Sequence, residues 1–597
     1  MSTAIDTVSP LVSVNGSPLS AAHLDALVSM RIELGLCIIG RATLRFSDPG
    51  YSIAESREFA VGTTVELKVN DAMTSQVQTL MSGRVTGVSL EQRGMEQPEL
   101  LVTVDDGASR LTRAVKPTTY VNMSYSDVIK KLAFDAGMSA DVPSEVGTSA
   151  PSEYLLQTGS ALSYIDRIAQ RMGMIWWADA DELVLKAAGT SIGTATLTAG
   201  LDLIDFSVRA SGLRPTKVNV TGWDPAQQQV ITEDVEAKAP DGASTFVTGY
   251  VGTGPVSGLL AGEASTGDCA PASQAEASAL AASIVGDAAD GAVIARGTSW
   301  GTARLKPAVT VQLSGAGPAS GSYLLSEVEH VYSSRGFYTR WVAGPRRPIG
   351  LVDTLGRAVP DPGLSVSGLV VGVVSNNGDD QNLGRVKVKY TSLAGEIESA
   401  WARVVSLGAG AGRGAVFQPE VNDEVLLGFE HADSRRPVVI GALYSKVKGL
   451  PEANKIVADG KVGYRRITSR LNHVLEFADG SGPETQHVLL QVGTAQTHKL
   501  RLGADAFDVE VADGKPVTIK AGSATFAINA SGEVEISGKK VTIKADTDVV
   551  IQGLNVTTKA SAKAAVQGTQ IEVKGSATTD VEASAMLTLK GGLVKIN

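Results

Sequence analysis

Apolar and polar residues alternate along much of this chain, the pattern of strands that bury one face. In the N-terminal part the alternation is clearest in residues 41–46 and 64–69, where every second side chain is apolar. β-Branched and aromatic residues are common in these stretches, and Gly, Pro and Asp residues lie between them. We therefore expect residues 1–345 to be rich in strands.

Three stretches depart from this alternation and predict helices. Ser124 precedes the apolar-periodic residues 125–133, an acidic residue occupies the third helical position, and Gly137 follows the helix. Residues 160–172 repeat the plan, with a serine before the first turn and a glycine after the last. An Ala-rich stretch, residues 274–287, predicts a third helix.

Glycine and proline punctuate residues 344–363, as in a linker between domains. Five short strand-like segments follow. They are residues 370–374, 384–390, 400–405, 424–429 and 437–441. Five strands in so short a stretch are typical of a small closed Greek-key barrel of the OB type.

The C-terminal region is a series of very short alternating segments. These are residues 534–536, 541–544, 549–551, 571–574, 587–590 and 594–596. No aromatic residue follows Phe526, and small residues lie between the segments. Similarity at so short a period is typical of a β-helix or solenoid.

One chain alone cannot stabilise such short segments. Each buries too little apolar surface to offset the entropy of ordering it, and no bulky side chain is present to fill a wide cross-section. Three identical chains wound about one axis would share a thin core and pair each other's strand edges. We therefore predict an intertwined trimeric β-helical needle with a core of Val541, Ile543, Val549, Ile551, Ile571, Val573, Leu587 and Leu589. The alternative, an unstructured repetitive tail, predicts Ser, Gln and Glu richness instead of β-branched alternation.

Composition narrows the function classes. The 597 residues carry a net charge of −10 without any Lys/Arg run, which argues against nucleic acid as a partner. Two cysteines, Cys37 and Cys269, cannot form a disulfide framework, and Cys37 lies in an apolar run typical of buried positions. No cationic-then-apolar leader or long apolar stretch is present, so we expect the protein to fold in a cytoplasm and to have no stable membrane association.

Several stretches resemble one known family. Residues 384–388, 401–404, 419–426 and 436–444 resemble the OB-fold core of VgrG-type spike proteins and of the related baseplate spikes of contractile tails. Residues 466–477 resemble the neck that begins this family's β-helix, and residues 220–225 and 323–330 resemble its hub. The resemblance thus covers nearly the whole chain in order.

The resemblance implies a mainly β fold with a few helices, divided into five parts. These are a hub of β-barrel-like modules (1–345), a linker (346–363), an OB-fold barrel (364–446), a neck (447–475) and a triple-stranded β-helical needle (476–597).

The function that the resemblance implies is that of a homotrimeric puncturing device driven by sheath contraction. Its hub would bind the inner tube and baseplate, and its C-terminal end would receive a PAAR-type tip protein through Val594, Lys595, Ile596 and Asn597. Effectors are further expected partners. Because neither a lysozyme domain nor a toxin domain is recognisable, the chain resembles the spike of a phage-like particle that is released or acts extracellularly.

We expect no catalytic, cofactor-binding or metal-binding residues. Residues 297–301 fit the nucleophile-elbow pattern, but a strand-like stretch follows where an elbow requires a helix. The glycine-rich residues 408–414 lack the Lys-Ser/Thr helix start of a phosphate-binding loop. The carboxylates Glu420, Asp423 and Glu424 could form a glycosidase pair, but they flank a turn, where a solvated edge or a turn cap is the better interpretation. The six histidines are scattered singly, without the spacing of metal ligands.

Two alternatives remain open. A trimeric β-helical tailspike that binds or cleaves glycans would share the needle architecture, but such a site needs aromatic residues, which the C-terminal stretch lacks. A secretion-system spike that carries effectors on its shaft or tip would have the same architecture as the particle spike.

Overall fold

The computed structural model describes residues 10–596 apart from a set of short stretches. These are 72–75, 114–116, 145, 147–150, 212–216, 225–226, 237–243, 252–262, 267–270, 272, 348–367, 392–396, 452–455 and 494–497. The chain forms two compact units, Met1–Lys448 and Gly449–Asn597. Cys269 and most of the predicted linker lie outside the described residues.

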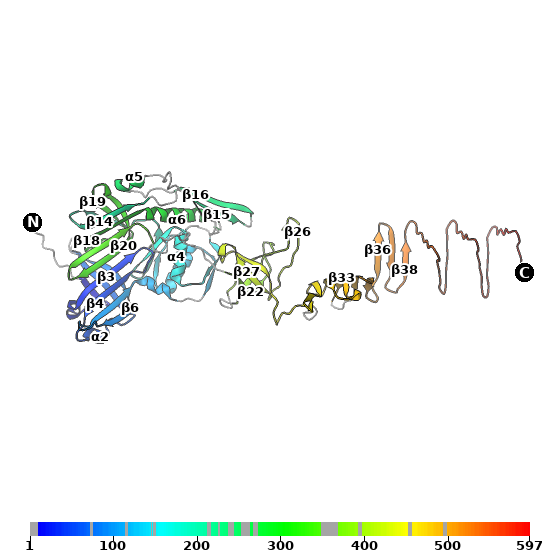
Figure 1. Cartoon of the computed structure of the whole chain (residues 1–597), viewed down its shortest axis with the longest axis horizontal. Helices are drawn as coiled ribbons and strands as arrows, with labels where there is room; N and C mark the ends of the chain where they lie inside the picture. The colour runs from blue at the N-terminus through cyan, green and yellow to red at the C-terminus, as the bar shows by residue number, and fades with distance from the viewer. Residues whose placement is uncertain are drawn as a thin grey trace, which may run out of the picture. The chain divides into compact units, whose positions relative to one another are not determined.

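A sheet of 13 strands dominates the first unit, in the order β14-β18-β21-β20-β3-β4-β7-β6-β5-β1-β2, with β19 and β13 branching from β20 (Figure 1). Its strands are β1 (Pro10–Val14), β2 (Ser17–Pro18), β3 (Leu27–Gly35), β4 (Arg41–Ser47), β5 (Thr64–Asp71), β6 (Gln76–Glu91), β7 (Glu99–Asp105), β13 (Gly193–Thr198), β14 (Leu203–Ala210), β18 (Val293–Trp300), β19 (Val309–Ser314), β20 (Gly321–Ser333) and β21 (Gly336–Ala343). The strands expected at residues 41–46 and 64–69 are thereby confirmed as β4 and β5.

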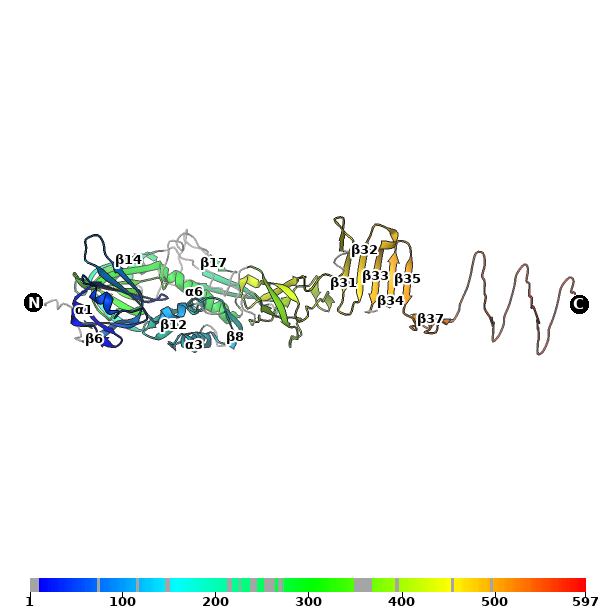
Figure 2. The ribbon, with the colours of Figure 1, turned by 90° about the horizontal axis from the view of Figure 1, so that it is seen from below.

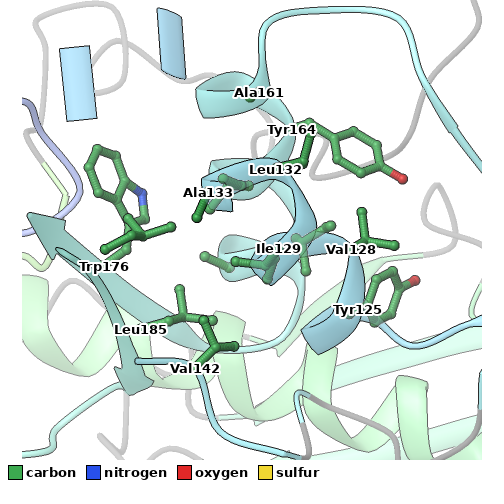
Figure 3. Packing of buried hydrophobic residues seen from close by; sticks show 14 of the residues in the cluster. Tyr125, Val128, Ile129, Leu132, Ala133, Val142, Ala161, Tyr164, Trp176 and Leu185 are labelled. Atoms are coloured by element: carbon green, nitrogen blue, oxygen red, sulfur yellow. The ribbon is translucent and has the colours of Figure 1, made fainter. Parts of the chain in front are cut away.

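Two helices pack together beside this sheet. In α3 (Tyr125–Asp135) and α4 (Ala161–Arg171) the preceding serine accepts a hydrogen bond from a backbone N–H of the first turn, as expected. Figure 3 shows Ile129, Leu132 and Trp176 directed into the shared core. The smaller helices are α1 (Ala21–Asp25), α2 (Ser52–Ser56) and α5 (Thr245–Val251).

Short sheets and a long helix complete the hub. The strands are β8 (Thr118–Met123), β9 (Ser139–Asp141), β10 (Ser152–Gln157), β11 (Met174–Asp179), β12 (Glu182–Ala187), β15 (Lys217–Asp224), β16 (Gln229–Glu236) and β17 (Glu263–Thr266). Helix α6 (Gln274–Ala292) extends beyond the expected end at residue 287 because it continues directly into β18. Its apolar side packs on β15 and β16 (Figure 1).

The barrel that follows contains the five expected strands, although two are shorter than expected. They are β22 (Val370–Asn376), β23 (Lys387–Tyr390), β24 (Arg403–Val404), β27 (Glu424–Phe429) and β28 (Pro437–Ala442), in the order β23-β22-β27-β28-β24. Antiparallel bridges from Val386 to Ala402 and from Lys389 to Glu398 join the two ends of this order. The sheet therefore closes, as an OB barrel requires.

The second unit begins with a hairpin of β29 (Val457–Ala458) and β30 (Lys461–Val462), and two larger antiparallel sheets follow. The shaft sheet, β31–β35, consists of β31 (Tyr464–Thr468), β32 (Val474–Asp479), β33 (Gln486–Val492), β34 (His498–Gly503) and β35 (Phe507–Val511), which lie side by side in Figure 2. A three-stranded sheet of β36 (Val517–Ala521), β37 (Ala524–Ile528) and β38 (Val534–Ser537) follows. Since β31 pairs with β32, pairing runs across the expected boundary between neck and needle at residue 475.

The single chain does not form the remaining strands expected in the needle. Residues 538–596 contain neither helix nor strand, so the strands expected from residue 541 onward are absent from the chain by itself. The physical reason is the one that suggested a trimer: segments of three or four residues have no partner strand within one chain. Within the described residues no helix is both long and apolar enough to cross a membrane.

Candidate assembly surface

One face of the shaft sheet is apolar across its whole width. Directly paired residues project from the same face of a sheet. One row of paired positions runs across all five strands and reads Ile467, Leu475, Leu490, Leu500 and Val509. A second row reads Phe477, Val488, Leu502 and Phe507, and its position on β31 is Arg465, which pairs with Asp479 at the edge of this face. Phe507 is 66% exposed and Val509 57%, so the described residues leave much of this face uncovered.

The opposite face of the shaft sheet carries paired charges. Glu476 is 6% exposed and accepts hydrogen bonds from Arg466 at 2.5 Å and from the His487 ring at 3.2 Å. Arg501 pairs with Asp508 at 3.2 Å. The Glu476 carboxylate is therefore buried and paired within the chain, whereas the Arg501–Asp508 pair is more exposed.

The three-stranded sheet continues the same division. Ile519, Phe526 and Ile536 form one row of paired positions, and Val517, Ile528 and Val534 form the next. Between these rows, Thr518, Ala527 and Glu535 project to the other face. Two successive sheets thus leave an apolar face uncovered, and contiguous exposed apolar surface of this kind marks a site of protein association.

The predicted needle core does not come together within one chain. Its eight residues are all exposed, from 51% for Val541 to 74% for Val573. The residues expected to contact a tip protein are exposed as well, Val594 at 50% and Ile596 at 83%. Lys595 is exposed, and Asn597 lies outside the described residues. Both sets remain predictions, because each requires a second chain.

The sequence analysis did not single out the apolar rows of the shaft sheet. Leu475 lies at the expected end of the neck and Phe477 in the expected needle, but neither these residues nor the rows from β33 to β35 are among those predicted for the needle core. The strict alternation of residues 498–503 and 507–511 is the signal that identifies them.

The motifs that could carry chemistry have structural roles. Ser299 is 1% exposed within β18, and its hydroxyl donates to the Thr339 carbonyl oxygen at 3.2 Å. The expected strand after it is β19, so the elbow pattern is not an elbow. The glycine-rich residues 408–414 form a hairpin of β25 (Ala409–Gly410) and β26 (Arg413–Gly414).

Asp423 and Cys37 also have structural explanations. Asp423 accepts a hydrogen bond from the Glu420 backbone N–H at 2.9 Å and therefore caps the turn, as expected. Burial raises the pKa of the Cys37 thiol to about 11, which keeps it protonated at neutral pH. Among the described residues no group of three or more His, Cys, Asp or Glu side chains could hold a metal ion.

Two protein families match this chain. Residues 4–334, more than half of the chain, match the family described as the Alg8 N-terminal domain. Residues 370–444 match the type VI secretion system/phage-baseplate injector OB domain, which coincides with the closed barrel.

A curated relative and several solved structures are similar to parts of the chain. The type VI secretion system spike protein VgrG3 of Vibrio cholerae is 32% identical over 105 residues, which cover 16% of this chain and 10% of that protein. A type VI secretion component of E. coli is 14% identical with a TM-score of 0.43, covering 72% of this chain and 99% of that one. A chain of the half-lidded Francisella PdpA-VgrG complex is 8% identical with a TM-score of 0.49, and the match covers 90% of this chain and 89% of that one.

The family matches, taken with the β-rich fold and the closed OB barrel, establish the assignment. The chain belongs to the family defined by the Alg8 N-terminal domain and is a VgrG-type spike protein of the contractile-tail baseplate class.

Proposed function

We propose that this protein is the non-enzymatic, homotrimeric spike of a contractile injection machine. The hub attaches to the inner tube and baseplate, and the C-terminal end receives a tip protein of the PAAR type. Sheath contraction drives the spike through a target envelope. The protein assembles in the cytoplasm, without a stable membrane association, before the particle acts outside, and effectors bind it as cargo.

The observation that carries this proposal is the set of exposed apolar rows on the two larger sheets of the second unit, which only the Arg465–Asp479 pair interrupts among the rows named above. Transfer of apolar surface out of water stabilises an assembly by about 25 cal/mol per Å². A single sheet with one apolar and one charged face has no core of its own. Packing three such faces about a common axis gives each chain a core and leaves the paired charges in solvent.

The same geometry supports a structural role over an enzymatic one. Shaft residues project either into the common core or into a surface of paired charges. The buried Ser299 hydroxyl is engaged by a backbone carbonyl, so it is not a free nucleophile. We therefore assign the protein the role of transmitting force.

A matched pair of variants in β36 tests the trimer. Ile519 lies on the apolar face and its neighbour Thr518 on the other. We expect Ile519→Lys to place three ammonium groups in the common core and to convert the trimer to monomers in sedimentation analysis. Thr518→Lys adds the same charge on the outer face and should leave the trimer intact.

Equal masses for the two variants would contradict the proposed orientation of this sheet. Loss of the trimer in both would show that added charge, rather than its position, is responsible.

A further inference from the structure

A buried cluster of four charged side chains joins the hub to the barrel. Arg171 of α4 and Glu276 of α6 belong to the hub and are each 2% exposed. Asp433 and Arg435 lie in the barrel, between η4 (Glu430–Ala432) and β28. Two guanidinium groups and two carboxylates make the cluster neutral, which burial requires.

Glu276 binds both arginines of the cluster, Arg171 of the hub and Arg435 of the barrel. Its Oε1 accepts from Arg171 Nε at 2.6 Å and from Arg435 Nη1 at 3.1 Å. The Tyr125 hydroxyl donates to the same oxygen at 3.3 Å and accepts from Arg435 at 3.2 Å. Arg435 therefore contacts α3 and α6 of the hub with one guanidinium nitrogen.

The barrel holds Arg435 in place before it meets the hub. The Asp433 carboxylate accepts from Arg435 Nε at 3.0 Å, from Nη2 at 2.7 Å and from the Arg435 backbone N–H at 2.9 Å. His431 and Ala432 just before it have positive φ values of 50° and 57°, which set the sharp corner of the chain. Because the Asp433 carboxylate already holds the Arg435 guanidinium group in one orientation, little side-chain entropy is lost when this group binds the hub.

Two further contacts surround the cluster. Arg436 donates to the backbone carbonyls of Trp223 and Pro271 in the hub, both at 2.8 Å. A small apolar cluster pairs Tyr154 and Leu156 of β10 with Tyr390 and Ile397 of the barrel. The barrel thus contacts the hub through polar and apolar side chains at several positions.

We propose that this junction, with Arg435 at its centre, fixes the orientation of the barrel on the hub and carries axial load between them. Buried charge pairs accept few geometries, since misalignment leaves a charge without a partner in a dry environment. The orientation is therefore set by these side chains. The load-bearing role rests on the proposed function, whereas the orientation does not.

The test uses the full-length protein and the variant Arg435→Met. This change keeps an unbranched, flexible side chain but removes the guanidinium group that pairs with Asp433 and Glu276. We expect class averages in electron microscopy to show several hub–barrel angles where the unmodified protein shows one. We also expect calorimetry to show the hub and barrel unfolding separately, with the first transition at least about 5 °C lower.

Arg403→Met is the matched control. Arg403 lies in the same barrel and pairs with Glu430, but its side chain is 50% exposed, so its loss should change neither readout. Arg435→Lys keeps the positive charge but lacks the planar guanidinium group. We expect its spread of hub–barrel angles to lie between those of the unmodified protein and of Arg435→Met.

The proposal is overturned if Arg435→Met keeps one angle and one transition. It is equally overturned if Arg403→Met or Arg435→Lys behaves as Arg435→Met does. The trimeric mass, measured on the same samples, reports on the proposed function independently of the junction.

Discussion

Burial decides the protonation of individual residues in the hub. His330 lies in β20 with its side chain inaccessible to solvent, and its Nδ1 is 3.1 Å from Thr339 Oγ1. Burial, together with the nearby Lys306 ammonium, lowers the pKa of His330 to about 3. His330 therefore packs and hydrogen bonds within the large sheet, and it is neutral at physiological pH.

This neutrality predicts acid sensitivity of the hub. The unfolded chain takes up a proton on His330 near pH 6.5, whereas the folded chain does so only near pH 3. Between these values the unfolded state binds more protons, so the free energy of unfolding falls as pH falls from 6.5 toward 3. Urea midpoints followed by tryptophan fluorescence should decline over this window. His330→Gln should give a flatter profile, and parallel profiles would contradict the assignment.

At the level of elements, the sequence predicts where several helices and strands lie, but it does not predict which other elements they contact. Serine caps and apolar spacing predicted α3 and α4, because those signals lie within a few residues of each other. The order of the 13-stranded sheet, in which β20 lies beside β3, depends on contacts between distant parts of the chain. The contact of Arg435 with Glu276 is equally non-local, so nothing near either residue signals it.

Alternation predicts the faces of a strand but not its neighbour. Residues 475–477 were expected in a neck, yet β32 pairs on both sides within one sheet. Beyond residue 538 no neighbour exists in the same chain. The needle core therefore cannot be observed in one chain, although its residues can be predicted.

Ile551 tests the needle at this level. It is 73% exposed in the single chain, and we expect it to lie in the shared core of the trimer. Ile551→Asp would place three carboxylates around one axis, and we expect it to prevent assembly into a heat-resistant trimer. Gln552→Asp, at the next position, should leave heat resistance unchanged in gel electrophoresis of unboiled samples. An Ile551→Asp protein as heat-resistant as the unmodified one would refute the inward orientation.

For the whole molecule, the two units have different ways of burying apolar surface. Met1–Lys448 contains its own cores, including those of the large sheet and of the closed barrel. Gly449–Asn597 has charged groups paired on one sheet face and apolar groups exposed on the other. This division is the one that the proposed trimer requires, in which the first unit folds by itself and other copies complete the shaft.

The mass of the unmodified full-length protein in solution tests this account most directly. Native mass spectrometry of a dilute solution should give three times the 61.8 kDa mass of one chain. A stable monomer with a folded second unit would contradict the account, since the apolar rows of the shaft would then need no partner.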